Sequence, residues 1–492
     1  DLRKDLFEKV QRFSFKNIDD FSTGSLVTRL TNDIQQMQNV IMMALRMMLR
    51  APGMLIGALI MAFVMNAKLA LVILVVIPLL TAAIVVILRT AFPRFQVMQE
   101  AIDKLNSGIQ EALTNVRVIK SFVREDHEEE KFAANNSNLM DKSLRAMNIV
   151  IATMPVMMLA MNITTLAVVW YGGNMIIGGT MQVGDLTAFT TYIVQILMSL
   201  MMLSMVFLQS SRAMASAKRV NEVMDTEIDL TDDHAARKDA LVTKGKVEFQ
   251  DVSFHYGEEE KGMVLEHITF TANPGETIGI IGSTGSGKTS LVQLIPRLYD
   301  ATGGRVLVDG IDVKDYSLEH LREGVGMVLQ KNVLFSGTIY DNIRWGNEHA
   351  SDEEVKRVCR LAQADGFVNE FPNGYETMIV QGGNNVSGGQ KQRLCIARAL
   401  LKKPKILILD DSTSAVDTKT DALIRKAFRE EIPDTTKIII AQRVSSIEDA
   451  DQIIVLDDGK IAGVGTSEEL LQTNEIYREV YESQVKGGEE DE

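Results

Sequence analysis

The sequence predicts an α-helical transmembrane domain fused to an α/β domain. Within residues 1–211, long runs lack any Asp, Glu, Lys or Arg, whereas from residue 246 short β-rich runs such as KVEFQDVSF, TIGIIG and KILILD alternate with helical stretches. Such alternation is typical of βαβ units. A chain of 492 residues also exceeds one ordinary hydrophobic core, so two or more domains are expected.

Four apolar runs predict membrane-spanning helices in the first domain. A bilayer core of about 30 Å needs roughly 20 apolar residues in a helix, and each run approaches or exceeds that length. The runs cover residues 51–67, 69–88, 147–173 and 186–211. The chain is therefore expected to be a multi-pass protein of the cell (inner) membrane, with the lipid bilayer as its surroundings.

Basic residues set the expected topology. The connector between residues 88 and 147 is rich in Lys and Arg, whereas residues 172–185 contain neither. By the positive-inside rule, the basic connector and both chain ends face the cytoplasm. Asp1 opens within a helical pattern, DLRKDLFEKVQRF, so we expect the natural N-terminus to lie upstream.

Composition narrows the function classes. A formal net charge of −14 argues against a nucleic-acid partner, which would require clustered Lys and Arg. Cys359 and Cys395 are far apart and lack metal-ligand spacing, so they are expected to be reduced and buried. The expected domains are a membrane domain at 1–211, a polar linker at 212–245, an α/β domain at 246–483 and a solvated acidic tail at 484–492.

The strongest motif is GSTGSGKT at Gly282–Thr289, directly after the strand-like ETIGII. It matches G-x-x-x-x-G-K-[ST], in which glycines let backbone N–H groups wrap phosphate, Lys288 reaches the outer phosphates and the Thr289 hydroxyl serves Mg²⁺. ATP and Mg²⁺ are therefore the expected cofactors. The expected nucleotide contacts here are Gly282, Ser283, Thr284, Gly285, Ser286, Gly287, Lys288, Thr289 and Ser290.

A second motif, ILILDDSTSAVD at 406–417, places two carboxylates after an apolar strand-like run. Ligands gather at the carboxyl ends of parallel strands, so Asp410 is expected to hold the same Mg²⁺ as Thr289. Asp411 raises the question whether it is a working catalytic base or a side chain one methylene too short.

The segment NVSGGQKQRLCIARAL places Ser387, Gly388, Gly389 and Gln390 just before a helix, where free N–H groups favour an anion. Alone, these residues would equally suit an ordinary N-cap turn. Together with the phosphate-binding loop, they make the sequence resemble the ATP-binding cassette (ABC) exporters. The resemblance covers the whole chain: the four spans look like the last four of a six-helix, type IV exporter half, and residues 246–483 look like its nucleotide-binding domain.

This resemblance implies further roles. Tyr256 would stack on adenine, the alternative being a half-buried strand aromatic. Gln330 would reach Mg²⁺ and the attacking water and couple to the membrane domain. Residues Ser387–Gln390 would be the signature motif, which binds the γ-phosphate of an ATP held by a second subunit, and Asp417 would bridge the two sites. The resemblance thus implies a second half-transporter as partner.

Three positions depart from the family pattern. The residue after the Walker B aspartate, Asp410, is usually Glu, and here it is Asp411. A shorter base is expected to reach its water poorly, since a misplacement of about 1 Å can cost on the order of 100-fold. The switch histidine is replaced by Gln442, which cannot carry a positive charge toward the transition state. Gln381 stands where the family often has Glu.

These departures resemble the weak-site subunit of bacterial heterodimeric multidrug-type exporters. The alternatives are a homodimer with two slow sites that acts as an ATP-gated regulator or sensor, and, disfavoured by the fused spans, an importer or a soluble ATPase. Two segments, at about 14–21 and 121–132, resemble the family's coupling helices, the alternative being solvated loops. Methionine-rich spans would suit a small amphipathic substrate, although ordinary lipid-facing or helix-packing methionine is the simpler reading. Polar candidates for a cavity lining are Asn162, Gln195 and Gln209.

Overall fold

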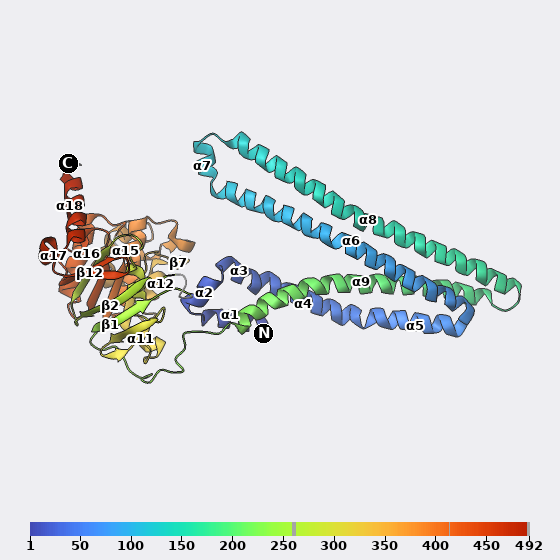
Figure 1. Ribbon diagram of the computed structural model, residues 1–492, viewed down its shortest axis with the longest axis horizontal. Coiled ribbons are helices and arrows are strands. Elements are labelled where there is room, and N and C mark those ends of the chain that lie inside the picture. The colour runs from blue at the N-terminus through green and yellow to red at the C-terminus, as the bar shows by residue number, and fades with distance from the viewer. Residues whose placement is uncertain (258–261, 413, 490–492) are drawn as a thin grey trace. The chain divides into compact units, whose positions relative to one another are not determined.

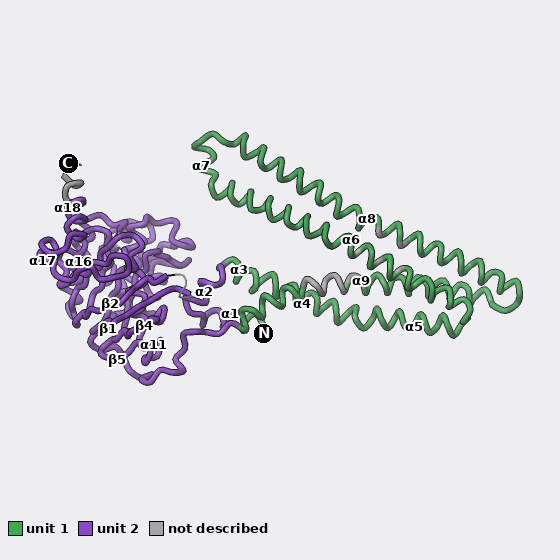
Figure 2. Tube along the Cα trace, in the orientation of Figure 1, with its two compact units in different colours: residues 1–7, 24–225 green, residues 8–23, 226–492 purple. Residues whose placement is uncertain are grey.

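The computed structural model describes residues 1–257, 262–412 and 414–489. The chain forms two compact units, one of residues 1–7 and 24–225, the other of residues 8–23 and 226–492 (Figure 2). Each unit is described by itself. The second unit takes in residues 8–23, which come from within the predicted membrane domain.

The first unit is built from helices, several of them very long (Figure 1). Their bounds are α1 (Leu2–Gln11, which ends in the second unit), α3 (Thr23–Thr28), η1 (Arg29–Asp33), α4 (Ile34–Met43), η2 (Ala44–Met48), α5 (Arg50–Met65), α6 (Ala67–Thr114), α7 (Val116–Ser121), α8 (Glu125–Ile177) and α9 (Val183–Asp225). Helices long and apolar enough to cross a membrane number four among the described residues, at 23–65, 67–114, 125–177 and 183–203. The prediction of four spans is confirmed.

Helices α6 and α8 pack along each other and are joined by the short helix α7 (Figure 1). A core of apolar side chains, including Ala62, Leu69 and Phe189, joins α5, α6 and α9. Toward α7, the α6–α8 pair diverges from α9 (Figure 1). This end of the hairpin therefore extends beyond the part of the unit where the helices pack together.

The predicted coupling segment at 121–132 differs from the structure. The short helix α7 comes earlier, and residues 125–132 form the first turns of α8. The chain turns between these helices at Val123, whose φ of 50° lies in the left-handed region that β-branched residues rarely adopt. This break depends on local backbone geometry that the composition of the segment does not reveal.

A buried polar cluster ties α9 to η1. Asp33 is 2% exposed and accepts hydrogen bonds from the Ser216 hydroxyl at 2.8 Å and from the Arg219 guanidinium. Both oxygens of the buried carboxylate are thus satisfied, as burial of a charge requires. Because η1 is a π-helical turn, the cluster lies where the regular hydrogen bonding of the helix changes.

The second unit is an α/β domain with short helix α2 (Phe15–Asp20) packed on it. Its strands are β1 (Val247–Phe254), β2 (Leu265–Ala272), β3 (Thr277–Gly282), β4 (Gly303–Val308), β5 (Ile311–Asp312), β6 (Val325–Val328), β7 (Gly337–Thr338), β8 (Met378–Ile379), β9 (Ile406–Asp410), β10 (Thr436–Ile440), β11 (Gln452–Asp457) and β12 (Lys460–Gly465). The main sheet has the order β12-β11-β3-β10-β9-β6, and β3, β6, β9, β10 and β11 run parallel within it.

A second sheet has the strand order β2-β1-β4-β5, β7 pairs with β8, and helices make up the remaining elements of the unit. The helices are α10 (Lys288–Gln293), α11 (Leu318–Gly324), α12 (Ile339–Arg344), α13 (Asp352–Leu361), α14 (Asp365–Glu370), α15 (Gly388–Leu401), α16 (Thr418–Glu431), α17 (Ser467–Thr473) and α18 (Glu475–Glu489), with short 3₁₀ turns η4 (Gly374–Glu376), η5 (Gln381–Gly383) and η6 (Val444–Ser446). All five residues of β9 and of β10 are buried, as expected for central parallel strands. Cys359 and Cys395 are free and buried, as predicted.

Two boundaries differ from the sequence prediction. Helix α9 continues to Asp225, so the first part of the expected linker is helical. Helix α18 includes residues 484–489, so the start of the expected acidic tail is helical as well. The end of α9 buries Val220 and Val223, and Gln484 of α18 hydrogen-bonds the loop at Gln442 and Val444; a polar composition does not reveal these contacts.

Candidate nucleotide-binding site

Four parallel strands deliver the predicted site residues to one edge of the main sheet. The register pairs Ile440 of β10 with Ile280 of β3 on one side and with Asp410 of β9 on the other. Strand β6 ends at Val328, beside Leu409 of β9. The phosphate-binding loop, Asp411, Gln442 and Gln330 each follow one of these strands, so the topology brings them to the same edge.

The phosphate-binding loop has the geometry that its glycines predict. Gly285 and Gly287 have φ of 87° and 90°, which a residue with a side chain rarely adopts. A Cβ at Gly287 would approach the Val264 carbonyl oxygen to 2.9 Å. Lys288 donates from Nζ to the carbonyl oxygens of Gly282 at 2.8 Å and Ser283 at 2.7 Å. The ammonium is thus held at the mouth of the loop, where phosphate oxygens could replace these carbonyls.

Asp410 and Thr289 fit a magnesium site. The Thr289 hydroxyl donates to Oδ1 of Asp410 at 3.1 Å, while Oδ2 of Asp410 is buried and has no hydrogen-bond partner among the described residues. Burial raises the pKa of Asp410, and the hydrogen bond from Thr289 opposes that rise. An unpartnered buried carboxylate oxygen beside a hydroxyl suits a hard cation. Because the described residues hold no cluster of three His, Cys, Asp or Glu, the ion would complete its coordination with phosphate and water.

Burial and nearby negative charges have opposite effects on the Lys288 ammonium. Burial lowers the pKa of Lys288, whereas the charges of Asp411 and Asp410 raise it. The ammonium therefore stays close to two carboxylates in a partly desolvated site. Triphosphate and Mg²⁺ would add charges of both signs to this arrangement, and Mg²⁺, when bound, neutralises charge on the phosphates.

Tyr256 lies half-buried beyond the end of β1. Its hydroxyl hydrogen-bonds the Ser290 hydroxyl at 2.9 Å and donates to Gln293 at 3.4 Å. Its ring meets Tyr299 edge-on, with centroids 5.1 Å apart. The ring is thus fixed beside the helix that follows the phosphate-binding loop, where the base of a bound nucleotide would extend. Gln293 and Tyr299 were not predicted, because their role depends on contacts across the fold.

Two of the three residues that depart from the family pattern, Asp411 and Gln442, contact each other directly. Gln442 donates from Nε2 to Oδ2 of Asp411 at 2.6 Å. Burial raises the pKa of Asp411, while hydrogen bonds from Gln442 and then Gln330 oppose that rise. Three predicted site residues therefore meet at one carboxylate. The Asp411 carboxylate is thus hydrogen-bonded by two side-chain amides and is not left to interact with water alone.

The backbone also constrains Asp411. Its φ is 49°, in the left-handed region, and its N–H donates to the Ile440 carbonyl oxygen at 3.1 Å. Asp tolerates this conformation better than most residues with a side chain. The conformation turns the chain sharply after β9, and residue 413, which follows, lies outside the described residues.

The predicted signature forms the N-terminus of α15. Ser387 is the N-cap: its hydroxyl accepts from the Gln390 N–H at 3.3 Å, and the Gln390 side chain accepts from the Ser387 N–H at 2.9 Å. This capping box leaves other first-turn N–H groups free for an anion. Gly389 is required by packing, since a Cβ there would come within 2.8 Å of the Ala415 carbonyl oxygen.

Asp417, the predicted bridging residue, caps the following helix in this chain. It is the N-cap of α16 and accepts from the Thr420 N–H at 2.9 Å, which lowers the pKa of Asp417. Gln392 of α15 holds the preceding loop, accepting from the Ala415 N–H at 3.1 Å. Signature helix and bridging loop are therefore mechanically joined, a link that the motifs did not reveal.

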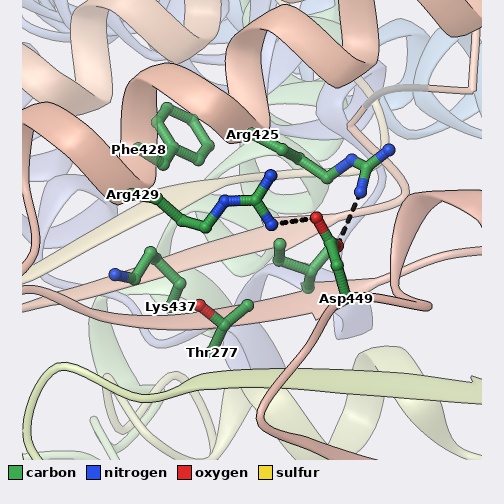
Figure 3. A pocket seen from close by; sticks show the side chains of 7 residues that line it. Thr277, Arg425, Phe428, Arg429, Lys437 and Asp449 are labelled. Carbon is green, nitrogen blue, oxygen red and sulfur yellow. Dashed lines mark hydrogen bonds and ion pairs between the residues drawn. The ribbon is translucent and has the colours of Figure 1, made fainter. Parts of the chain in front are cut away.

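A small pocket lined by basic side chains lies near the starts of β3 and β10, the opposite end of these strands from the site. Asp449 accepts from Arg425 at 2.6 Å and from Arg429, both on α16, and Figure 3 shows the carboxylate between the two guanidinium groups. The Lys437 side chain lines the same pocket but its amine points away from Asp449 (Figure 3). Ser446 adds a hydrogen bond to Asp421 of α16 at 2.9 Å. These contacts anchor the segment that follows Gln442 to α16.

Helix α2 contacts the domain close to Tyr256. The Tyr299 hydroxyl donates to Asp19 at 2.7 Å, and the rings of Phe15 and Tyr299 lie 6.1 Å apart. Asn17 donates to the Glu227 carbonyl oxygen at 3.1 Å. One tyrosine therefore touches both α2 and the aromatic residue of the predicted adenine site.

The polar candidates in the spans do not converge on a site. Asn162 is exposed on α8, Gln195 is partly buried on α9, and the side chain of Gln209 lies outside the described residues. Most of the described methionines in the spans are exposed or partly exposed, as helices in lipid require. These residues identify no substrate.

Comparisons with known proteins agree with this geometry. The family model described as the ABC transporter transmembrane region matches residues 1–200, and the model described as ABC transporter matches residues 265–414. The chain belongs to the ABC transporter family. Its architecture is that of an exporter half-transporter, with a helical membrane domain fused to a cytoplasmic nucleotide-binding domain, and the predicted fold class is confirmed.

Individual relatives of this ABC transporter chain match it over nearly its whole length. The ABC transporter ATP-binding protein YfiB of Bacillus subtilis (strain 168) is 43% identical over 484 residues, covering 98% of this chain and 83% of YfiB. The ATP-dependent lipid A-core flippase of Syntrophus aciditrophicus (strain SB) is 34% identical over 489 residues, covering 99% and 80%. A bacterial Atm1-family ABC exporter solved with ATP bound superposes with a TM-score of 0.85 at 27% identity, covering 98% and 84%.

Proposed function

We propose that this chain is one subunit of a heterodimeric ABC exporter. In this proposal its own site binds MgATP but hydrolyses it slowly, and its signature completes the hydrolytic site of a partner half-transporter. The family establishes an ATP-driven membrane exporter. The division of labour between two subunits is the added proposal.

The contact between Gln442 and Asp411 carries the proposal. At 2.6 Å, the amide of one changed residue occupies an oxygen of the other. A general base needs its oxygen within about 2.6–3.2 Å of the proton it takes, and a neutral amide adds no positive charge toward the transition state. The binding groups Lys288, Thr289 and Asp410 follow the family pattern, so binding and hydrolysis are affected unequally.

The signature supports the second half of the proposal. Ser387 and Gln390 form a complete capping box at the start of a 14-residue helix. The conformation of the motif therefore does not depend on a nucleotide bound at this chain's own site. Its sequence follows the family pattern closely. In the proposed dimer it binds the γ-phosphate at the partner's site, with Asp417 bridging the two sites.

Two short helices are proposed to transmit force. Helix α2 contacts Tyr299 and the Glu227 carbonyl through Asp19 and Asn17, which suits a joint with its own nucleotide-binding domain. In the other unit, the α7 turn exposes Phe122 at 73% and Val123 at 81%. Exposed apolar side chains in a strained turn suit docking on the partner's nucleotide-binding domain.

The proposed substrate is a small amphipathic or lipid-like molecule. Methionine side chains can repack around varied apolar shapes, and the chain's relatives include a protein named as a lipid flippase. Substrate identity is tested by efflux or flipping assays with dyes and labelled lipids in proteoliposomes.

Vanadate trapping tests the weak-site proposal. The complex purified from native membranes is incubated with a photoreactive ATP analogue and vanadate, and the labelled subunit is identified. Label in the trapped transition-state complex should lie mainly on the partner, whereas non-trapped nucleotide should be retained on this chain. Trapped label mainly at Lys288 would overturn the proposal, and copurification of this chain with itself alone would favour the homodimer.

A further inference from the structure

The side chain of Gln484, on helix α18, holds the loop that carries Gln442. Its Oε1 accepts from the Val444 N–H at 2.8 Å, and its Nε2 donates to the Gln442 carbonyl oxygen at 2.8 Å. Both ends of one amide therefore pair with backbone groups two residues apart. Gln442 and Arg443 lie between β10 and η6, so Gln484 supplies hydrogen bonds that no regular element provides.

Helix α18 is itself firmly attached to the domain. Tyr477 is fully buried, its N–H donates to Asn474 at 2.9 Å, and its hydroxyl hydrogen-bonds Ser467 at 2.9 Å. Ile476 and Val480 pack against the core of the domain. Gln484 thus approaches the loop from a fixed support.

We propose that Gln484 is a positioning residue of the nucleotide site. By fixing the backbone on both sides of Arg443, it sets where the Gln442 side chain lies, and the 2.6 Å hydrogen bond passes that placement on to Asp411. The inference rests on the proposed role of Gln442 beside the bound nucleotide. It assigns to the C-terminal helix an influence on how long MgATP stays bound.

The test compares Gln484→Met with wild type in the full-length protein. Methionine has the same reach but makes neither hydrogen bond. The measurement is the dissociation rate of a fluorescent ATP analogue with Mg²⁺ from this chain. Loss of one to two net hydrogen bonds should speed dissociation on the order of threefold to tenfold.

Two control variants separate positioning from general loosening of α18. Ser483→Ala removes a hydroxyl that donates within the helix, to Val480. Tyr477→Phe removes the hydroxyl contact with Ser467 at the base of the helix. Both should dissociate nucleotide at the wild-type rate. If Tyr477→Phe matches Gln484→Met, the effect is structural and the proposal fails.

Gln484→Glu supplies a pH signature. The carboxylate only accepts, so it keeps the Val444 contact but places negative charge against the Gln442 carbonyl, while the protonated acid can donate again. Dissociation, measured relative to wild type between about pH 7 and pH 4, should therefore slow toward the wild-type rate as pH falls through the titration range of a Glu carboxyl, near about 4.3. Gln484→Met should show no such recovery.

The outcomes distinguish this inference from the weak-site proposal. If vanadate trapping shows rapid hydrolysis on this chain, the weak-site proposal fails, but Gln484→Met should then lower kcat with little change in KM. If dissociation and hydrolysis both stay at wild-type values, and Gln484→Glu shows no pH recovery, the positioning role is wrong.

Discussion

The phosphate-binding loop and the loops facing it across the sheet edge differ in what they retain of an ABC ATPase. The loop keeps the groups that bind: Lys288 and Thr289 with Asp410, whose buried Oδ2 suits Mg²⁺. The loops after β9 and β10 carry Asp411 and Gln442 in place of the family's usual Glu and His, and these two side chains hydrogen-bond each other. Affinity and turnover therefore depend on different residues at one edge of the sheet, even where, as with Asp410 and Asp411, both lie at the end of β9, so one can be weakened while the other is kept.

The same contrast extends to α15. The signature lies at the start of a different helix, joined through Gln392 to the loop that begins after Asp411. One domain thus contains a nucleotide-binding site in which the reacting groups are altered. It also contains a complete signature motif that a second subunit can use. Mutations that affect only one of these regions can sharpen or break the comparison.

Gly388→Glu should have the largest effect. A carboxylate at the signature would stand where the γ-phosphate of the partner's ATP must lie, and loss of a group that stabilises transferred phosphate costs about 100-fold or more. ATPase activity of the complex should fall by about that factor. The space for a Cβ at residue 388 is ordinary, with the Ala415 Cβ 3.5 Å away, so the variant should fold.

The control for this variant is Gly366→Glu. Gly366 lies on α14, and a Cβ at this position would meet no heavy atom of the described residues within 4 Å, so the variant adds the same charge away from the signature. Its activity should equal wild type. Full activity of Gly388→Glu with normal assembly would contradict the proposed use of the signature by a partner.

Lys288→Ala should affect binding more than hydrolysis. Loss of a charge-assisted contact to phosphate should weaken MgATP binding at this chain's own site by about 10-fold to 100-fold. Hydrolysis by the complex should fall by less than about tenfold, one step of about 1.4 kcal/mol in the barrier, because the partner's site does most of the work. Equilibrium binding and steady-state ATPase are measured in the same membranes.

Lys460→Ala is the matched control, since Lys460 pairs with Glu266 at the surface. It should change neither quantity. Complete loss of hydrolysis in Lys288→Ala, with activity retained in Gly388→Glu, would make this chain's own site the working one and Asp411 a real base.

Asp411→Glu alone should raise ATPase activity by less than about tenfold, one step of about 1.4 kcal/mol in the barrier. Gln442 still supplies no positive charge, and the longer side chain must adopt the left-handed conformation of residue 411. Because the two side chains touch, Asp411→Glu with Gln442→His should exceed the product of the single changes. A larger gain from Asp411→Glu alone would mean that the short carboxylate is the sole defect.

The sequence predicts the binding half of this site better than its internal contacts. The phosphate-binding loop and Asp410 follow apolar strands, and parallel strands align their carboxyl ends, so motif and fold point to one edge. The bond between Asp411 and Gln442 instead depends on the pairing of Ile440 with Asp410, which a single sequence does not show. Gln484 is hidden further, because it opens an acidic segment whose composition is typical of a solvated tail.

Local breaks in helices are equally hard to predict. The family resemblance placed the second coupling segment at 121–132, whereas the short helix α7 ends at Ser121 and the chain turns at Val123, whose φ is 50°. The spans were predictable because lipid imposes a minimum apolar length, a constraint that does not depend on tertiary contacts.

Asp410→Asn should have the smallest effect, a change in the Tm of the nucleotide-binding domain. The sign of this change shows whether Asp410 serves cation binding or the stability of the fold. Burial raises the pKa of Asp410 in the folded chain, so the ionised carboxylate destabilises the nucleotide-free fold above that pKa. Asn keeps an acceptor for Thr289 without the charge. At pH 7, without Mg²⁺ or nucleotide, a gain of about 1 kcal/mol would raise the Tm of this domain by about 2–4 °C.

The difference in Tm between Asp410→Asn and wild type should shrink as pH falls toward about 4, where the wild-type carboxyl becomes protonated in the unfolded chain as well. Addition of MgATP should reverse the order, since only the carboxylate offers its unpartnered oxygen to the cation. Thermal unfolding followed by tryptophan fluorescence, with and without MgATP, measures both effects. A lower Tm for Asp410→Asn without ligand would show that the buried carboxylate stabilises the fold by itself, and that its position cannot be explained by cation binding.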